Sequence, residues 1–209
     1  MGRGRLTRIG LLGGTFDPPH VGHLWLATLA RDALGLDRVL VIPAPQPPHK
    51  LGRPMSLVAD RVALVRAAIA DDPSLELSTI ELERAGPHYT IDTVAALRAA
   101  LPDEVEPVLI MAADSLAEID TWREPERLLA SLAWAVGPRP GAPNPDPAAL
   151  RARFGAAAAR IHLLDGPSLD VSATAIRSRV AAGRTIRYLV PRRVEAEITA
   201  RRLYIGGAS

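Results

Sequence analysis

Short apolar runs alternate along the chain with longer stretches in which apolar positions recur at helical spacing. The runs are rich in Ile, Leu and Val and are bounded by Gly, Pro or Asp, which predicts buried strands. We expect strands at 8–13, 38–43, 75–79, 107–113, 132–137 and 159–166. Apolar residues three and four apart predict helices at 20–34, 57–72, 89–101, 114–122 and 125–132, and two closing helices within about 172–204.

Strands that alternate with helices predict an α/β fold of the Rossmann-like, doubly wound type, with a mainly parallel sheet and helices on both faces. The Pro- and Gly-rich stretch PRPGAPNPDP (138–147) is predicted to be a loop rather than a domain linker, because strand patterns lie on both sides of it. We therefore expect residues 1–209 to form a single domain.

Polar clusters follow four of the predicted strands. Their sequences are GGTFDPPH, PPHK, AADS and PRPG. In open parallel sheets, ligands bind beyond the carboxyl ends of the strands, where the strand order reverses. The four clusters therefore predict one binding site at one edge of the sheet.

The composition is that of an ordinary soluble domain, with 48% hydrophobic and 23% charged residues. No apolar run approaches the roughly 18 residues of a membrane span, and no secretory leader is apparent, so we expect a cytoplasmic protein with no membrane partner. The net charge of +2 is too small to indicate nucleic-acid binding. The absence of cysteine excludes disulfides, thiolate nucleophiles and Cys-based metal sites. A homo-oligomer remains open.

Basic residues are almost all arginine: of 25 Lys and Arg residues, only Lys50 is lysine. Its compact ammonium differs chemically from the planar guanidinium, which makes it a candidate for a specific role. A chance occurrence is the alternative.

The stretch GGTFDPPHVGH, from Gly13 to His23, begins where the first strand ends. Gly13 and Gly14 let backbone N–H groups approach a ligand closely. His20 and His23 fall at the start of the next helix, where free N–H groups and the helix dipole favour an anion. The spacing matches neither the dinucleotide fingerprint nor the P-loop, and the pattern indicates a phosphate-binding turn.

Two other interpretations of the histidines remain. A histidine at a helix start is often only a cap or a solvated side chain. The His-x-x-His pair could instead bind a metal, but this needs a third ligand, and nearby Asp17 would have to turn across two prolines. We therefore expect no protein-bound metal.

The segment GTFDPPHVGH resembles the GTFDPxHxGH signature of the HxGH nucleotidyltransferase superfamily, and SATAIR (172–177) resembles its second signature near the C-terminus. The further segments PPHK, HYTIDT, ADSL with Trp122, PRPG and RYLVP are similar to bacterial nicotinate-nucleotide adenylyltransferases. The likeness runs from about Ile9 to Tyr204. Phosphopantetheine adenylyltransferases share the first signature but are shorter and lack PPHK and YTIDT.

This resemblance implies transfer of the adenylyl group of ATP, with Mg²⁺, to nicotinate mononucleotide, giving deamido-NAD and pyrophosphate. An adenylyltransferase for another phosphorylated acceptor, such as phosphopantetheine, and a non-catalytic nucleotide-binding sensor are the alternatives. The attacking phosphate is already an anion at neutral pH, so no general base is required, and positioning and charge neutralisation suffice.

The resemblance also assigns residues. The predicted catalytic group is His20, His23, Lys50 and Arg177. The predicted ATP contacts are Gly13, Gly14, Thr15, Phe16, His20, His23, Asp114, Ser172, Thr174 and Arg177, with Asp114 as a buried carboxylate on the ribose. The predicted nicotinate-nucleotide contacts are Lys50, Thr90, Trp122 and Arg139.

The chain departs from the family pattern at two positions. Ala112 stands where the family usually has glycine, and Ala173 replaces the second serine of the usual Ser-Ser-Thr. Both changes leave the predicted cations in place, so we expect effects on affinity rather than on activity.

Overall fold

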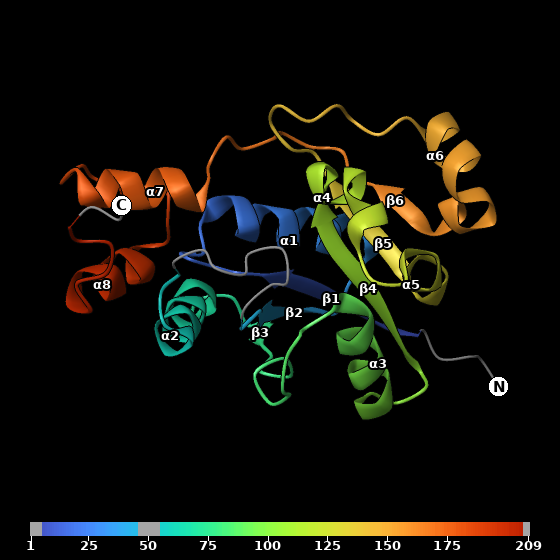
Figure 1. Ribbon diagram of the computed structural model, residues 1–209, viewed down its shortest axis with the longest axis horizontal. Coiled ribbons are helices and arrows are strands. Elements are labelled where there is room, and N and C mark those ends of the chain that lie inside the picture. Colours follow the sequence, from blue (N-terminus) through green and yellow to red (C-terminus); the bar gives the residue numbers. More distant parts are fainter. Residues whose placement is uncertain (1–5, 46–54, 207–209) are drawn as a thin grey trace.

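The computed structural model describes residues 6–45 and 55–206. The strands in these residues form one sheet in which every strand is parallel to its neighbours (Figure 1). The strands are β1 Thr7–Gly14, β2 Arg38–Pro43, β3 Leu75–Leu77, β4 Val105–Ala112, β5 Ala133–Gly137 and β6 Ile161–Leu163. Their order is β3-β2-β1-β4-β5-β6. The chain order reverses between β1 and β4, so the crevice for a ligand lies beyond the carboxyl ends of these two strands.

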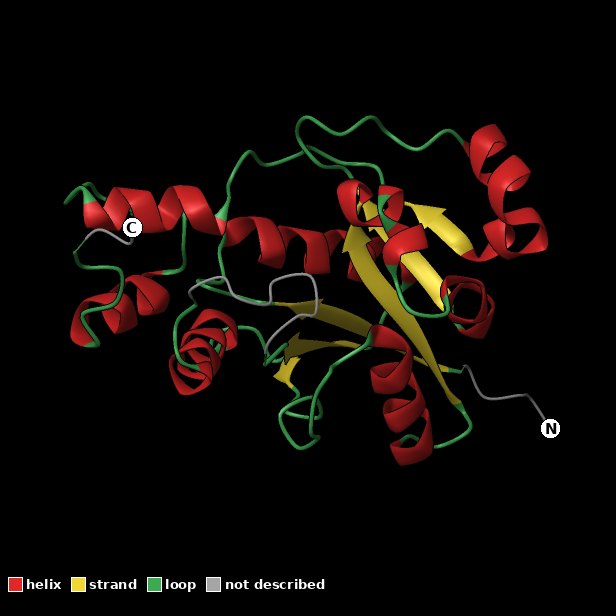
Figure 2. Cartoon of the chain, in the orientation of Figure 1, coloured by secondary structure: helices red, strands yellow, loops and turns green. Residues whose placement is uncertain are grey.

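Helices connect the strands (Figure 2). They are α1 Val21–Leu34, α2 Val58–Ile69, α3 Thr90–Ala100, α4 Ala113–Ala117, α5 Pro125–Ser131, α6 Pro147–Phe154, α7 Ala173–Ala181 and α8 Arg192–Ala200, with 3-10 turns η2 Ile119–Thr121 and η3 Gly155–Arg160. Within the described ranges, no helix is both long enough and apolar enough to cross a membrane.

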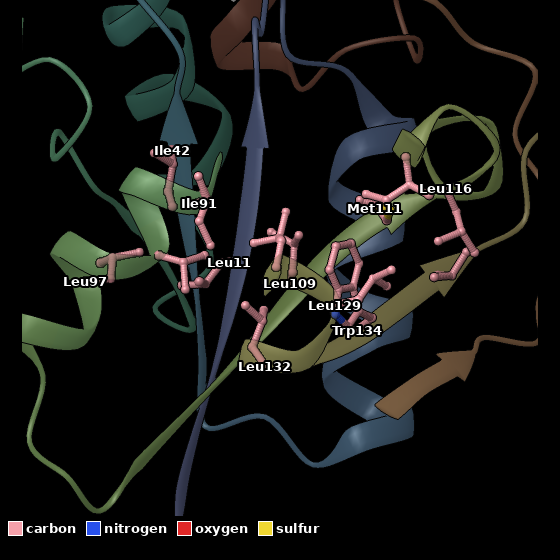
Figure 3. Close-up of a cluster of buried hydrophobic side chains, with 14 of the residues drawn as sticks. Leu11, Ile42, Ile91, Leu97, Leu109, Met111, Leu116, Leu129, Leu132 and Trp134 are labelled. Carbon is pink, nitrogen blue, oxygen red and sulfur yellow. The ribbon is translucent and has the colours of Figure 1, made fainter. Parts of the chain in front are cut away.

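Alternate side chains of the strands feed two separate cores, one on each face of the sheet. In β4, Leu109 and Met111 join the core under α3, α4 and α5, which is drawn in Figure 3, whereas Val108 and Ile110 join the core under α1 and α2. This follows from the two-residue period of a strand, and it explains why the central strands are apolar throughout. The predicted helices on both faces are confirmed.

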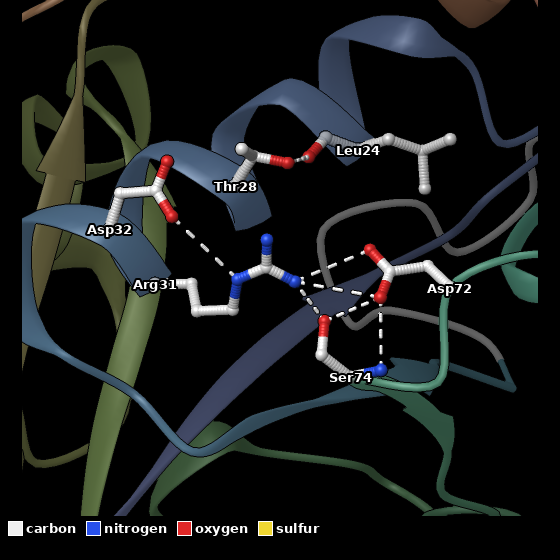
Figure 4. Close-up of polar contacts among 6 residues, drawn as sticks. All are labelled: Leu24, Thr28, Arg31, Asp32, Asp72 and Ser74. Atoms are coloured by element: carbon white, nitrogen blue, oxygen red, sulfur yellow. Dashed lines mark hydrogen bonds and ion pairs between the residues drawn. The ribbon is translucent and has the colours of Figure 1, made fainter.

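Polar contacts fasten α1 to the connection between α2 and β3. Arg31, in the last turn of α1, donates from Nη1 to the hydroxyl of Ser74 and lies 3.4 Å from the Asp72 carboxylate (Figure 4). The hydrogen bond from the Ser74 hydroxyl is the main cause that holds the pKa of Asp72 below its usual value. The helix that begins at the histidines is therefore held at its far end as well.

The two C-terminal helices build a third apolar cluster against α2. Ile176 of α7, and Val194 and Ile198 of α8, pack with Leu64 of α2. These side chains are almost completely buried. The C-terminal part of the chain is thereby placed beside the carboxyl ends of β1 and β2.

The predicted elements agree with the structure to within a few residues except in two regions. The helix expected at 114–122 is divided into α4 and the 3-10 turn η2, and the chain differs from the prediction near β6 and α6. The strand expected at 159–166 is confined to Ile161–Leu163, because residues 155–160 form η3. Helix α6 was not expected, although Asp146 caps it by accepting hydrogen bonds from the N–H groups of Ala148 and Ala149. The run NPDP, interpreted as loop alone, thus also contains a helix start.

Candidate functional site

A cavity of about 880 Å³ opens beyond the carboxyl ends of β1 and β4. Its volume is in the range of pockets that hold a nucleotide-sized ligand. The sequence-predicted residues that line it are Gly13, Gly14, Thr15, Phe16, His20, His23, Thr90, Asp114, Trp122, Arg139, Ser172, Thr174 and Arg177. Lys50 lies outside the described residues. The fold therefore gathers every other predicted site residue around one cavity.

The turn after β1 is built around Phe16. Its backbone has a φ of 51°, in the left-handed region, and its side chain is buried. A Cβ on Gly14 would lie 3.0 Å from the Phe16 ring, whereas a Cβ on Gly13 would meet nothing within 4 Å. A side chain at position 14 would therefore crowd the Phe16 ring, whereas Gly13 leaves backbone open to the cavity.

The two histidines lie at the start of α1 in a fixed relation. His20 is the N-cap residue, and its backbone N–H donates to Nδ1 of His23 over 3.2 Å. Because Nδ1 of His23 accepts this bond, the proton of its neutral ring is on Nε2, which leaves an N–H donor at the other side of the ring. The ring centroids of His20 and His23 are 3.8 Å apart.

Burial and a neighbouring cation keep His20 neutral. Its side chain is only 4% exposed. Burial first, and the positive charge of Arg139 second, lower the pKa of His20 from 6.5 to about 4. The ligand-free site at neutral pH therefore offers His20 as an uncharged group, which an arriving anion would bias towards the protonated form.

The second signature forms the start of α7 at the edge of the same cavity. Ser172 is the N-cap, and its Oγ accepts from the N–H of Ala175 over 3.2 Å. Arg177 donates from Nη1 to the backbone carbonyl of Asp17 over 2.8 Å and from Nη2 to Oγ1 of Thr174 over 3.4 Å. Segments about 160 residues apart in sequence thus meet at one edge of the cavity.

Asp114 differs from its prediction in burial and in its partner. It was expected to be buried, but it is exposed, because it lies in the first turn of the short helix α4 at the rim of the cavity. Its Oδ2 is 3.3 Å from Nε of Arg139. Residues assigned to the ATP ribose and to the mononucleotide therefore form an ion pair with each other.

Thr90 and Trp122 enter the cavity from the opposite face of the sheet. Thr90 is the first residue of α3, and Trp122 follows η2 and packs against the core beneath it. The side chain of Tyr89 lies beside them, with the Arg123 guanidinium 4.8 Å from its ring centroid. This end of the cavity offers flat aromatic surface next to the N-terminus of a helix.

No group of three or more His, Asp or Glu side chains is placed to hold a metal ion within residues 6–45 and 55–206. In this part of the chain, the paired histidines therefore lack the further ligands that a metal centre requires.

Asp17 and Arg61 are buried polar residues that do not belong to the sequence-predicted site. Asp17 is 5% exposed, and Arg61 is completely buried. The Arg61 guanidinium donates to the carbonyl oxygens of Thr15, Ala44, Pro45 and Ser56, at 2.6–3.2 Å. Arg61 lies three and four residues before the apolar Leu64 and Val65, so its charge falls in the apolar stripe of the predicted helix 57–72. A charge in such a stripe is the sequence feature that indicates a buried arginine.

Comparison with known proteins agrees with this geometry. Residues 11–179 match the family described as cytidylyltransferase-like. A "probable nicotinate-nucleotide adenylyltransferase" of a Roseiflexus species is 47% identical over 94% of this chain and 97% of its own length. One of Symbiobacterium thermophilum is 44% identical over 98% of both chains. The chain belongs to the nicotinate-nucleotide adenylyltransferase family. The family predicted from the HxGH, PPHK and YTIDT segments is thereby confirmed.

The fold of solved adenylyltransferases matches as well. A nicotinic acid mononucleotide adenylyltransferase of Plasmodium falciparum, complexed with NaAD, aligns with a TM-score of 0.79 at 17% identity, over 95% of this chain and 97% of that chain. This likeness shows a shared Rossmann-like nucleotidyltransferase fold. This chain, a member of an ATP-using nucleotidyltransferase family, therefore has both the sequence signatures of the family and the parallel-sheet fold of its solved structures.

Proposed function

We propose that this protein transfers the adenylyl group of ATP to nicotinate mononucleotide, giving deamido-NAD and pyrophosphate. The observation that carries the proposal is one cavity lined both by the phosphate-binding elements, at the starts of α1 and α7, and by the aromatic end at Thr90 and Trp122. A single anion site would suit any nucleotide, whereas the second end supplies a surface for a flat pyridine ring. Family membership at more than 40% identity supports the same acceptor.

The reaction is a displacement at the α-phosphorus. A 5′-phosphate oxygen of the mononucleotide forms a bond to the α-phosphorus, and the bond from that phosphorus to the oxygen bridging to the β-phosphate breaks. Pyrophosphate leaves with the electron pair. The nucleophile is an anion at neutral pH, so the protein needs to orient the two phosphates and stabilise charge on the transferring and leaving groups.

His20 and His23 are the proposed contacts of the α-phosphate side. Nε2 of His23 is the donor, since its Nδ1 accepts the backbone bond from His20. His20 starts neutral, and the triphosphate charge raises its proton affinity, so it supplies a stronger donor as charge develops. Gly13, Gly14, Thr15 and Phe16 form the backbone path beside the nucleotide.

The start of α7 is the proposed site of the β- and γ-phosphates. Ser172, Thr174 and the half-buried Arg177 lie at its N-terminal end, where the helix dipole adds positive potential. Arg177 also donates to the carbonyl of Asp17, so it can neutralise the leaving pyrophosphate while the turn before His20 stays aligned.

The acceptor nucleotide is assigned to the aromatic end. Trp122 would stack on the pyridine ring, and the Thr90 region would hydrogen-bond its carboxylate. Asp114 would accept from ATP ribose hydroxyls, and Arg139, paired with it, would turn towards the mononucleotide phosphate or carboxylate. Lys50 would neutralise phosphate charge near the acceptor.

Mg²⁺ would enter as part of the ATP complex. The described residues hold no group of metal ligands at this site, which is consistent with a metal bound chiefly by substrate phosphates. We also infer that residues 1–209 act as one cytoplasmic domain, since the cluster between α2, α7 and α8 joins the C-terminal helices to the sheet.

Pyrophosphate release from ATP over a panel of acceptors tests the proposal. Nicotinate mononucleotide should support turnover with Mg²⁺, and the amidated mononucleotide should be the poorer acceptor. If phosphopantetheine supported turnover and nicotinate mononucleotide did not, the proposed acceptor would be wrong, although the assignment to the nucleotidyltransferase superfamily would stand. ATP binding without release under any acceptor would favour the sensor.

A His20→Ala variant tests the catalytic assignment in the same assay. It should lower kcat by about 10²-fold and weaken ATP binding far less, because its donor acts mainly on charge that grows in the transition state. Equal losses in kcat and in ATP affinity would remove His20 from the catalytic group.

A further inference from the structure

The turn that carries His20 is attached to the C-terminal end of the chain by a contact from Tyr204 that plays no part in the proposed reaction steps. We propose that Tyr204 is a positioning residue for adenylyl transfer, acting through Asp17. The assignment of a role in transfer rests on the proposed function. Tyr204 follows α8 and lies 187 residues from its partner in sequence.

The carboxylate of Asp17 is the junction. The Tyr204 hydroxyl donates to Oδ1 of Asp17 over 2.6 Å, and the N–H of Ser56, at the start of α2, donates to Oδ2 over 3.2 Å. Asp17 is 5% exposed, so these donors replace the water that a carboxylate requires. Three residues further along the chain, His20 begins α1.

Other contacts from the C-terminal part hold the same turn on either side of the prolines. Arg177 donates to the Asp17 carbonyl over 2.8 Å. The N–H of Val21, directly after His20, donates to the carbonyl of Leu189 over 3.0 Å. The backbone on both sides of His20 is therefore bonded to residues beyond 172, and Tyr204 adds a bond from the same part of the chain to the Asp17 side chain.

Tyr204 is itself held in an unusual backbone conformation. Its φ is 61°, in the left-handed region that bulky side chains rarely adopt, and Arg202 has a φ of 53°. Such a turn persists where its surroundings determine it, and Tyr204 packs against the cluster of α2, α7 and α8. Burial first, and then the bond to Asp17, raise the pKa of its phenol, so the hydroxyl remains a donor.

A purely structural role would affect stability and leave the chemistry of folded molecules unchanged. A positioning role predicts a loss in kcat, because a small displacement of a catalytic group lowers rate more than ground-state binding. Tyr188 provides a matched control, because it is 86% exposed and Tyr188→Phe also removes a tyrosine hydroxyl from the C-terminal region.

The experiment compares Tyr204→Phe with Tyr188→Phe in the full chain, with the folded fraction measured by circular dichroism. Tyr204→Phe should lower kcat about tenfold while changing the KM for ATP by no more than about twofold, and Tyr188→Phe should resemble the unaltered protein. Asp17→Asn in the Tyr204→Phe background should add little further loss, because both changes break one link. Equal kcat values for the two tyrosine variants would overturn the proposal. So would a kcat loss in the double variant that equals the product of the losses in Tyr204→Phe alone and Asp17→Asn alone.

A second readout does not depend on turnover. In the ligand-free protein, Tyr204→Phe should shift the His20 ring signals in the NMR spectrum, and Tyr188→Phe should leave them in place. Unchanged His20 signals in Tyr204→Phe would refute the link between these residues. If those signals shift while the unaltered protein releases no pyrophosphate with nicotinate mononucleotide, the proposed reaction fails and the structural link stands.

Discussion

The backbone N–H of His20 donates to Nδ1 of His23 over 3.2 Å, so the His23 side chain satisfies the backbone donor of the N-cap residue of α1. His23 thus holds the turn through Nδ1, and its proposed role as a donor to a ligand falls to Nε2. It also assigns the proton of the neutral His23 ring to Nε2. The two roles can be tested separately.

His23→Asn should keep the fold and lose activity. The amide oxygen of asparagine can accept the His20 N–H as Nδ1 does, but no group then reaches the position of Nε2. Unfolding by urea should show a change below about 0.5 kcal/mol for Asn and a loss of about 1–2 kcal/mol for Ala, which leaves the donor unpaired. Both variants should release pyrophosphate slowly. A fully active His23→Asn protein would exclude the Nε2 donor.

The low pKa of His20 should appear as a pH dependence of stability. Its folded pKa of about 4 lies below the ordinary value of 6.5, so between these values the unfolded chain binds a proton that the folded protein does not. The free energy of unfolding should therefore fall as the pH drops from 6.5 to 4, by roughly 3 kcal/mol in total from this group. Above pH 6.5 the group contributes no slope.

Urea unfolding at a series of pH values measures this loss. His20→Asn should show a slope that is smaller by up to about 1.4 kcal/mol per pH unit in that window. ATP should raise the titration midpoint of the His20 ring signals in the NMR spectrum, because added negative charge favours the protonated form. A midpoint near 6.5 without ligand would contradict the burial argument.

Gly22→Ala should lower activity without lowering the stability of the protein. A Cβ at Gly22 would lie 3.1 Å from Nδ1 of His20, so the ring must move by a few tenths of an ångström. Alanine favours the helix over glycine by up to about 1 kcal/mol. We expect unchanged or raised stability together with about tenfold lower kcat, measured by urea unfolding and pyrophosphate release. Undiminished kcat would show that the position of the His20 ring is not critical.

Arg61→Met should destabilise the protein strongly. It removes the donors to carbonyls in three segments, namely the turn after β1, the residues after β2 and the residues before α2. Leaving buried carbonyls unpaired costs about 1–3 kcal/mol each, so we expect a total loss of roughly 3 kcal/mol or more. Arg61→Lys should recover only part, because one ammonium cannot span the set.

Arg66→Met on the exposed side of the same helix is the control for Arg61. It should change the free energy of unfolding by no more than about 0.5 kcal/mol. Equal effects at the two positions in urea unfolding would show that the buried guanidinium is not what joins the three segments.

The sequence by itself determined the class of fold, most element positions and the residues around the cavity. Apolar strands such as 107–113 are recognisable because burial on both faces requires continuous hydrophobicity, and the HxGH and SATAIR segments because their chemistry is local. Where the local pattern was weak, as in the Ala- and Arg-rich residues 147–160, helix α6 was missed.

Only the tertiary structure decided which charges are buried and which polar groups meet. The exposure of Asp114 and its pairing with Arg139 depend on how helix α4 and the segment after β5 leave two neighbouring strands. The bond between Asp17 and Tyr204 joins residues from opposite ends of the chain, and Arg61 bonds to carbonyls, which no side-chain pattern encodes. Periodicity reports the face on which a residue lies; its partners across the fold are set by the packing of distant segments, and these partners fix the pKa of His20 and the alignment of the turn that carries it.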